Sequence, residues 1–441
     1  MSVRTIENYV GGAFVGARSG ATVDDVAPAT GEVLARIPRS DADDVRAAVD
    51  ACEDAARGPW AHTTVAERAD LLDAIADRIE ERLDELATLE SDDAGKPRSL
   101  ARTVDIPRAI ANFRFFAGAV RHHEDGFQSM PGAINYTLRR PVGNVALITP
   151  WNLPLYLLSW KTAPALAMGN RVIAKPSELT PLTAHALAEI VDEVGLPAGA
   201  FNVVHGLGAE AGQALCEAEG VGAISFTGGT ATGRTVARTA APDFKKLSLE
   251  LGGKNPTLVF DDADLDRAVA GAVQAGFANQ GEICLCGSRV LVQRGVFDAF
   301  VERFVDRVRK LRVGDPSDAK TQVGALISAA HRDKVEGYLE LAKQEGGTIL
   351  CGGDRPSLQG DLAGGFFLEP AVITGLAPGC RTATEEIFGP VVTVHPFDTE
   401  DDALAIANGT RYGLSASVWT RDLDRAHRVG ARLDTGMVWV N

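Results

Sequence analysis

Apolar residues recur at intervals of three and four in the early part of the chain, a spacing that predicts an amphipathic helix. The recurring positions are Leu71, Leu72, Ile75, Ile79, Leu83 and Leu86. Thr64 and Glu67 precede them at the spacing of a capping box, in which each side chain bonds the other residue's backbone N–H. The sequence therefore predicts a helix that begins near Thr64 and stops near Gly95-Lys96-Pro97.

Other stretches before Val142 carry strand patterns or irregular ones. Residues 7–38 contain short strand-like runs joined by Gly and Pro turns. Residues 100–118 predict a further helix, with Pro107 as an irregularity because proline lacks a backbone donor. Residues 124–141 are polar and turn-rich, and apolar and polar side chains alternate within them, which predicts a hairpin.

From Val142 onward, apolar strand-like runs alternate with helical segments. The runs are Val145–Ile148, Val172–Ala174, Phe201–Val204 and Ala223–Phe226. A helix is predicted between them over Thr183–Val194. After Leu249 the alternation restarts with Thr257–Phe260, a helix over about residues 265–279, and Val290–Val292. Such alternation predicts an α/β fold with parallel sheets covered by helices, a domain boundary near residue 250, and a second unit to about residue 425.

Composition narrows the classes of function. A chain of 441 residues can form two or three domains with a large buried core. Its apolar content of 45% and aromatic content of 6% are typical of a soluble globular protein. A net charge of −15 disfavours binding to nucleic acid or to an anionic membrane surface.

Cysteine and histidine usage bears on compartment and metal binding. The 6 cysteines are too sparse for a disulfide framework, and no apolar signal segment precedes them. Prolines 150 and 154 interrupt the uncharged stretch 141–160, so it is a poor membrane span. None of the 8 histidines lies near a cysteine pair at the spacing of zinc ligands. We expect a cytoplasmic protein with no metal, membrane or nucleic-acid partner.

One cysteine lies in a setting typical of a nucleophile. Cys284 falls within Phe277–Arg289, a small polar turn flanked by glycines and followed by an apolar run. A structural cysteine usually lies inside an apolar element, whereas backbone N–H groups or helix ends stabilise a reactive thiolate. Upstream, Glu250 precedes Gly252 and Gly253, which let the backbone pass close to a bulky group. A thiol nucleophile and a separate carboxylate base can form and then hydrolyse a thioester.

Two glycine-rich turns follow predicted strands and open helices. The first contains Gly206, Gly208 and Gly212, and the second runs from Phe226 to Gly233. A single turn of this kind is most often an ordinary strand-to-helix connection, and the plain G-x-G-x-x-G fingerprint is absent. Two of them in consecutive units favour a nucleotide site, because free N–H groups and a positive helix end attract a pyrophosphate.

The segments Asn279–Cys284 and Leu249–Lys254 resemble the signatures of the NAD(P)-dependent aldehyde dehydrogenase superfamily, and the resemblance covers nearly the whole chain. It implies an enzyme that oxidises an aldehyde to a carboxylic acid. It also implies that Cys284 attacks the aldehyde carbon, that Asn152 and the cysteine's own N–H hold the oxyanion, and that Glu250 activates the water that hydrolyses the thioester. Without the resemblance, Asn152 would be interpreted as bonding its own turn. Cys286 is interpreted as a packing residue or a bystander thiol.

The resemblance further implies which residues hold NAD. They are Ile148, Thr149, Pro150, Trp151, Lys175, Ser177, Glu178, Gly208, Gly212, Phe226, Thr227, Gly228, Gly229, Leu251, Gly252, Glu386 and Phe388. On their own, Lys175 and Glu178 would be interpreted as a solvated loop, Glu386 as a surface acid and Phe388 as a core aromatic. A carboxylate on the ribose hydroxyls repels a 2′-phosphate, so Glu178 favours NAD over NADP.

The finer pattern over residues 100–108 and 278–286 is similar to that of the 2-aminomuconate and 2-hydroxymuconate semialdehyde dehydrogenases. Their substrates carry a carboxylate, which a guanidinium can bind through two parallel hydrogen bonds. Arg108 matches the carboxylate-binding arginine of that subfamily, and its alternative is a solvated helix residue. The same resemblance implies that Leu153, Leu157 and Trp160 line an apolar tunnel.

The family also implies an organisation into domains. We expect a Rossmann-like NAD-binding domain over residues 1–123 and 142–249, a catalytic domain over 250–425, and an oligomerisation hairpin at 124–141 together with 426–441. Family members continue beyond Asn441, so we expect a truncated chain, which forms a homodimer or homotetramer if its C-terminus is complete. Two alternatives stay open: an aldehyde dehydrogenase for an aliphatic or betaine-type aldehyde, or a truncated NAD-binding protein without catalysis.

Overall fold

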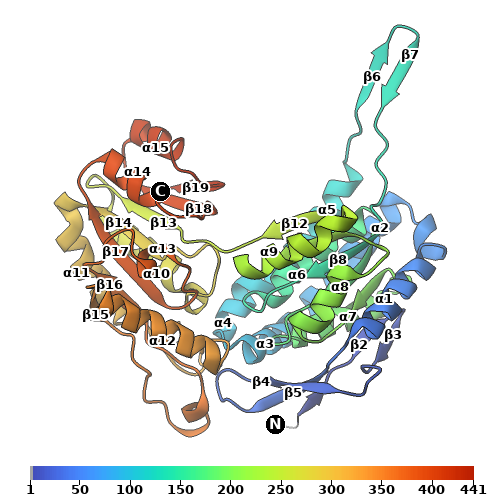
Figure 1. Ribbon diagram of the computed structural model, residues 1–441, viewed down its shortest axis with the longest axis horizontal. Coiled ribbons are helices and arrows are strands. Elements are labelled where there is room, and N and C mark those ends of the chain that lie inside the picture. Colours follow the sequence, from blue (N-terminus) through green and yellow to red (C-terminus); the bar gives the residue numbers. More distant parts are fainter. Residues whose placement is uncertain (1–2) are drawn as a thin grey trace. The chain divides into compact units, whose positions relative to one another are not determined.

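The computed structural model describes residues 3–441, and the chain divides into two compact units (Figure 1). The N-terminal unit contains the residues up to Ala27 together with Val33–Ala94 and Arg98–Glu250. The C-terminal unit contains Pro28–Glu32, Gly95–Pro97 and Leu251–Asn441. The chain thus leaves the N-terminal unit for the last time after Glu250, where the alternation of strands and helices restarts. Within residues 3–441, no helix combines the length and apolar character needed to cross a membrane.

The N-terminal unit is built on a seven-stranded sheet in the order β12-β11-β8-β9-β10-β2-β3. Its strands are β2 (Asn8–Val10), β3 (Ala13–Val15), β8 (Asn144–Ile148), β9 (Arg171–Lys175), β10 (Phe201–Val203), β11 (Val221–Thr227) and β12 (Lys246–Glu250). Strands β8 to β12 pair in parallel, and β2 joins β10 in antiparallel register. The parallel part confirms the predicted α/β class, and it places the carboxyl ends of β8, β9 and β11 at one edge of the sheet.

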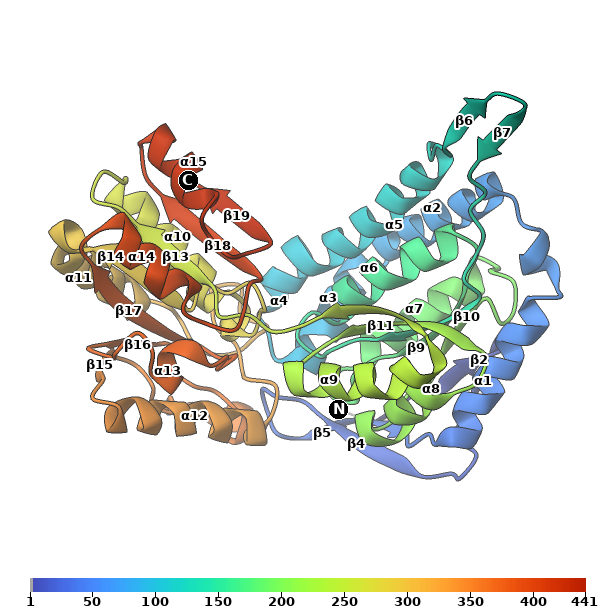
Figure 2. The ribbon, with the colours of Figure 1, turned by 45° about the horizontal axis from the view of Figure 1, so that its top comes forward.

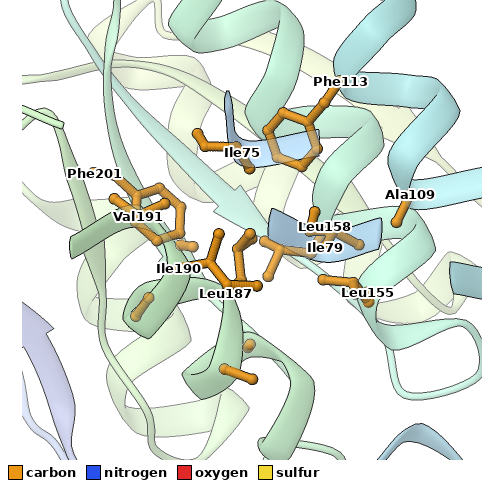
Figure 3. Packing of buried hydrophobic residues seen from close by; sticks show 14 of the residues in the cluster. Ile75, Ile79, Ala109, Phe113, Leu155, Leu158, Leu187, Ile190, Val191 and Phe201 are labelled. Atoms are coloured by element: carbon orange, nitrogen blue, oxygen red, sulfur yellow. The ribbon is translucent and has the colours of Figure 1, made fainter. Parts of the chain in front are cut away.

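Four helices pack together beside this sheet and form the core of the unit (Figure 2). They are α2 (Val65–Glu81), α5 (Ile106–Arg121), α6 (Pro154–Ala167) and α7 (Leu182–Glu193). Figure 3 shows Phe113 of α5, Leu158 of α6 and Ile190 of α7 converging on one another. Each of the three is fully or almost fully buried, and truncating such a buried side chain to alanine typically costs about 2–5 kcal/mol. The core therefore fixes the start of α6, next to Asn152.

Further elements complete the unit. A three-stranded sheet contains β1 (Arg4–Thr5), β4 (Thr22–Val26) and β5 (Val33–Pro38) in the order β1-β5-β4. The remaining helices are α1 (Ala42–Ala55), α3 (Leu83–Ala94), α4 (Arg98–Leu100), α8 (Gln213–Glu217) and α9 (Thr230–Ala240). Helices α8 and α9 follow β10 and β11, so their N-termini meet the same edge of the seven-stranded sheet that ends β8 and β9.

The long periodic stretch is two helices rather than one. Helix α2 ends at Glu81 and α3 begins at Leu83, because the backbone of Arg82 departs from helical geometry. The expected irregularity near Pro107 is confirmed as a π-helical turn at Ala101–Asp105, directly before α5. The backbone stays helical from α4 through this turn into α5, since Leu100, Asp105 and Ile106 all have right-handed helical angles.

The predicted hairpin is confirmed as β6 (Phe127–Met130) paired with β7 (Ala133–Tyr136) in antiparallel register. It extends from the end of α5 (Figures 1 and 2), and each of its residues is exposed. Phe127, Ile134 and Tyr136 are 69%, 64% and 60% exposed. The hairpin therefore has no core of its own within the unit.

The C-terminal unit contains a second seven-stranded sheet in the order β15-β16-β17-β14-β13-β18-β19. Its strands are β13 (Pro256–Val259), β14 (Arg289–Gln293), β15 (Thr348–Cys351), β16 (Ala371–Thr374), β17 (Val391–Phe397), β18 (Ser415–Trp419) and β19 (Met437–Val440). Its helices are α10 (Leu265–Phe277), α11 (Phe297–Val308), α12 (Ala329–Gln344), α13 (Arg381–Thr384), α14 (Glu400–Asn408) and α15 (Leu423–Gly430). The strands pair in parallel, except that β15 is antiparallel to β16.

The last residues differ from the expectation that 426–441 accompany the hairpin. Strand β19 pairs with β18, with Ser415 opposite Met437, so these residues extend the sheet of the C-terminal unit. Helix α15 covers the same sheet through Val429, which is buried in a cluster with Leu258 and Val418. The second unit consequently runs beyond residue 425.

The capping box at the start of α2 is confirmed. The N–H of Glu67 donates to Thr64 Oγ1 at 3.2 Å, and the N–H of Thr64 donates to Glu67 Oε2 at 2.7 Å. We expect Thr64→Ala to lower the free energy of unfolding by about 1 kcal/mol, because orphan N–H groups at the helix start lose a partner. Urea denaturation of the full chain measures this. Thr88→Ala within α3 is the control, and an equal loss in both variants would contradict a capping role.

Candidate active site

The backbone ahead of Cys284 takes an uncommon path. Asn279, Gln280 and Gly281 have φ angles of 50°, 56° and 73°. A left-handed conformation costs a residue other than glycine about 1–3 kcal/mol and persists only where its surroundings enforce it. Here Gln280 Oε1 accepts a hydrogen bond from the N–H of Gly324 at 3.3 Å, and Asn279 Nδ2 donates to the carbonyl of Glu282 at 3.3 Å. The turn is thus held by buried side chains.

The two cysteines of the turn differ in their environment. Cys284 is partly exposed, whereas Cys286 is buried. Burial raises the pKa of Cys286 to about 12, so its thiol stays protonated near neutral pH. Because the thiolate is the attacking species, the accessible Cys284 is the better candidate nucleophile.

Glu282 and His331 connect this turn to the loop that contains Phe388. Glu282 Oε1 accepts from the N–H of Ile327 at 3.2 Å and lies 3.6 Å from His331 Nε2. The same nitrogen lies 2.6 Å from the carbonyl of Phe388. Burial lowers the pKa of His331 to about 4, so its ring is neutral near pH 7 and Nε2 donates to that carbonyl. Sequence reasoning missed both residues, since a single histidine on a helix carries no distinctive pattern.

Glu386 lies against the glycines that follow Glu250 in the sequence. The N–H of Gly253 donates to Glu386 Oε1 at 2.9 Å, and burial raises the pKa of the Glu386 carboxyl. A Cβ on Gly252 would overlap Glu386 Oε2, so only glycine allows this approach. Phe388 has a φ of 63°, which turns the chain just after Glu386. The structure therefore brings Gly252, Glu386 and Phe388 together within the C-terminal unit; Leu251 is the first residue of this segment.

A pocket of about 250 Å³ opens at the carboxyl edge of the sheet in the N-terminal unit. Among its lining residues are the predicted Ile148, Thr149, Pro150, Trp151, Lys175, Ser177, Glu178, Gly208, Gly212, Phe226, Thr227, Gly228 and Gly229. Gln213, Cys216, Thr232, Thr235 and Val236 also line it and were not predicted. All five lie on α8 and α9, the helices that follow the two glycine turns, a position from which they could have been inferred.

The pocket has the polar groups that a dinucleotide needs. Lys175 Nζ donates to Glu178 Oε2 at 2.8 Å. Burial alone would raise the pKa of Glu178, but Lys175 and the backbone N–H groups of Glu178 and Gly208 together outweigh burial and hold that pKa below its usual value, so Glu178 is ionised. No side chain caps the N-terminus of α9, and a Cβ on Gly229 would meet open space. The residues fit NAD, with a carboxylate for the ribose and free helix N–H groups for the pyrophosphate.

Glu250 lies at the end of β12, a strand that sequence reasoning did not predict because its alternation is short. It lines a second pocket of about 420 Å³ together with Trp160, Lys161 and Ser225. Lys161 Nζ donates to Ser225 Oγ at 2.8 Å, and burial lowers the pKa of Lys161 to about 8, with Glu250 opposing the shift. Lys161 was missed, although it is the charge that ends an uncharged stretch. A carboxylate and an amine of lowered pKa therefore line the same pocket.

The other predicted residues of the N-terminal unit lie along α5 and α6. Asn152 and Leu153 are buried at the start of α6, and Leu157 is partly exposed one turn later. Arg108 is exposed on α5, and its guanidinium lies 5.6 Å from the centre of the Tyr156 ring on α6. Of the predicted substrate residues, Trp160 lines the 420 Å³ pocket, whereas Arg108, Leu153 and Leu157 are not among its lining residues.

Comparison with known proteins covers both units. The profile of the aldehyde dehydrogenase family matches residues 14–441. The chain is 48% identical to 2-aminomuconic semialdehyde dehydrogenase from Danio rerio, over 100% of this chain and 91% of that protein. It is 46% identical to 2-hydroxymuconic semialdehyde dehydrogenase from Pseudomonas sp. strain CF600, over 100% and 92%. The NAD+ complex of an aldehyde dehydrogenase from Bacillus cereus superposes with a TM-score of 0.96 at 39% identity, over 99% of this chain and 88% of that one.

The position of Glu178 predicts the choice of cofactor. We expect Glu178→Gln to narrow the preference for NAD over NADP by roughly tenfold in kcat/KM, because a repulsion of about 1.4 kcal/mol at the 2′ position is removed. Steady-state kinetics with both cofactors measures the ratio. Glu189→Gln on α7, which removes a carboxylate paired with Arg82 at 2.7 Å, is the control. A ratio that Glu178→Gln leaves unchanged would place this carboxylate away from the ribose.

Proposed function

We propose that the substrate of this enzyme is a semialdehyde carrying a carboxylate. The chain belongs to the aldehyde dehydrogenase family and oxidises aldehydes with NAD. The observation that carries this proposal is Arg108, a cation whose guanidinium lies over the Tyr156 ring of α6. The helix it faces also contains Trp160, which lines the same pocket as Glu250. The names of the semialdehyde dehydrogenases to which the chain is similar support the same class, 2-aminomuconic or 2-hydroxymuconic semialdehyde.

Cys284 is the proposed nucleophile. Its thiolate attacks the aldehyde carbon, and the new C–S bond gives a thiohemiacetal with a negatively charged oxygen. The partial exposure of Cys284 and the burial of Cys286 support this assignment. The left-handed turn at Asn279 and Gln280 supports it as well, because enforced backbone conformations cluster at reactive sites.

Asn152 is the proposed donor to that oxygen. Its amide N–H is rigidly placed, since Asn152 is 4% exposed at the buried start of α6. Preorganised donors of this kind are typically worth ~3–4 kcal/mol of transition-state stabilisation. Asn152 would act together with the backbone N–H of Cys284.

Glu250 is the proposed base for the second half of the reaction. It removes a proton from water, which attacks the thioester carbon and releases the carboxylic acid and the Cys284 thiolate. Lys161 lines the same pocket, and burial lowers its pKa to about 8. A medium of low polarity around Lys161 and the charge of Glu250 together set that pKa.

NAD, when bound, supplies the acceptor for the hydride that leaves the thiohemiacetal carbon. Lys175 and Glu178 would hold the adenosine ribose, and the N-terminus of α9 would hold the pyrophosphate. Glu386 and Phe388 would orient the nicotinamide ribose and ring, an assignment that rests on the family. The glycines at 252 and 253 keep the Glu386 carboxylate in place.

We also propose that copies of the chain assemble through the β6–β7 hairpin. Its exposed Phe127, Ile134 and Tyr136 have no core within the unit, and apolar residues in such an arrangement favour contact with another surface. A homodimer or homotetramer fits this. A reducing cytoplasm fits the cysteines, none of which is part of a disulfide.

Arg108→Ala tests the proposed substrate. We expect kcat/KM for muconic-type semialdehydes to fall about ten- to a hundredfold, since a hydrogen bond to a charged group contributes about 1.5–3 kcal/mol. Uncharged aldehydes should be nearly unaffected, because they have no carboxylate to lose. Arg108→Lys should recover part of the loss, since a point charge replaces a planar fork.

A matched control for this experiment is Arg102→Ala. Arg102 is exposed near the start of α5 and pairs with Asp84, away from Tyr156. The Arg102→Ala variant should keep the parental kcat/KM for every aldehyde tested. The measurement is the rate of NADH production with charged and with uncharged aldehydes. If Arg108→Ala lowers kcat/KM equally for both classes, Arg108 is structural, and the class of aldehyde substrate is left unspecified.

A further inference from the structure

A buried asparagine bonds the backbone on both sides of the C-x-C segment. Asn255 is 3% exposed and lies just before β13. Its Nδ2 donates to the carbonyl of Cys284 at 2.7 Å and to the carbonyl of Cys286 at 3.0 Å. Its Oδ1 accepts from the N–H of Ser415 on β18 at 3.1 Å. One uncharged amide therefore satisfies three backbone groups from two separate segments.

A backbone hydrogen bond and a close approach at Gly253 also hold these segments next to one another. The N–H of Arg289 donates to the carbonyl of Asn255 at 3.3 Å, which ties β13 to β14 directly after the cysteine turn. A Cβ on Gly253 would lie 2.6 Å from the carbonyl oxygen of Cys284 and 2.9 Å from Asn255 Oδ1. Glycine at 253 thus leaves the space in which the Cys284 carbonyl meets the amide.

We propose that Asn255 is a positioning residue for the nucleophile, an inference that rests on the proposed role of Cys284. A fixed carbonyl at Cys284 fixes the ψ angle of that residue and, with it, the direction of its Cα–Cβ bond. Asn255 never contacts substrate in this account. It acts by keeping Sγ and the backbone N–H of Cys284 in one orientation.

The chemistry of the three bonds explains why this position requires an amide. Two of the partners are acceptors and one is a donor, so the side chain must both donate and accept. An ionised aspartate of the same shape would accept only and would face two carbonyl oxygens. A leucine would fill the space without bonding any of the three groups. Serine is too short to reach partners on both segments at once.

The test compares Asn255→Asp and Asn255→Leu with the matched variants Asn408→Asp and Asn408→Leu. Asn408 also bonds two backbone groups through both ends of its amide, with one donor bond fewer, on the surface of the C-terminal unit: Nδ2 donates to the carbonyl of Arg432 and Oδ1 accepts from the N–H of Asp434, each at 3.0 Å. We expect the single-turnover rate of NADH formation at saturating aldehyde to fall roughly a hundredfold in the Asn255 variants, the cost of a small misplacement of a reacting group. KM and NADH affinity should change little, and the Asn408 variants should keep the parental rate.

A second readout separates positioning from general loosening. Alkylation by iodoacetamide, followed by peptide mass analysis, gives the rate at Cys284 relative to Cys351, a partly exposed thiol on β15. Positioning predicts that the rate at Cys284 falls while that at Cys351 stays constant. Equal rises at Cys284, Cys286 and Cys351 would indicate a loosened fold and would overturn the proposal.

Gly253→Ala keeps the amide and displaces the same carbonyl, so it carries the test if the Asn255 variants do not fold. It should lower the single-turnover rate with Asn255 intact, and an unchanged rate would contradict the proposal. Cys284→Ala distinguishes a failure of the proposed nucleophile from a failure of the proposed role of Asn255. Turnover that survives Cys284→Ala would remove the proposed nucleophile itself. An inactive Cys284→Ala alongside fully active Asn255 variants would remove only the role of Asn255.

Discussion

The site depends on one constraint, the left-handed backbone that delivers Cys284. Asn279 and Gln280 adopt positive φ angles at a cost, and the surrounding C-terminal unit compensates because the buried side chains of Gln280 and Glu282 accept hydrogen bonds from the N–H groups of Gly324 and Ile327. On the far side of the cysteine, Asn255 holds the carbonyls of residues 284 and 286. The thiol is therefore presented by a segment that is held on both sides, and its accessibility contrasts with the burial of Cys286 two residues later.

In the N-terminal unit, the main structural constraint is that polar groups lie together at one edge of a sheet. Parallel strands β8, β9 and β11 end together, so Thr149, Lys175 and Thr227 meet in one pocket although they are distant in sequence. The core formed by α2, α5, α6 and α7 holds the helix that begins beside Asn152. Its rigidity is what makes a preorganised donor possible at that position.

Much of this was predictable from the sequence where one physical rule dominates. The strands around Ile148, Ala174 and Val203 follow from apolar runs, and the start of α2 follows from the Thr64–Glu67 pair, because burial and capping are local signals. Strand β12 was missed since its leucines alternate over a short, mostly exposed segment. The break at Arg82 was missed because apolar spacing continues through it.

The contacts that tune the site were less predictable, since they depend on residues distant in the chain. Nothing around Asn255 marks it as a partner of Cys284 until β13, β14 and β18 are placed side by side. Lys161 gains its lowered pKa from burial beside Ser225 of β11, a neighbour 64 residues away in the chain that only the folded structure supplies. Residues 437–440 pair with β18 rather than with the hairpin, because strand partners are chosen by tertiary packing.

Trapping the covalent intermediate tests the central claim most directly. The Glu250→Gln variant, mixed with NAD and an aldehyde substrate, should release a burst of NADH with little steady-state turnover, because hydrolysis is blocked after hydride transfer. The reaction is then quenched in acid, which preserves the thioester. Peptide mass analysis should then find the acyl group of the substrate on Cys284. An acyl group on Cys286, or a full burst with neither cysteine modified, would contradict the account.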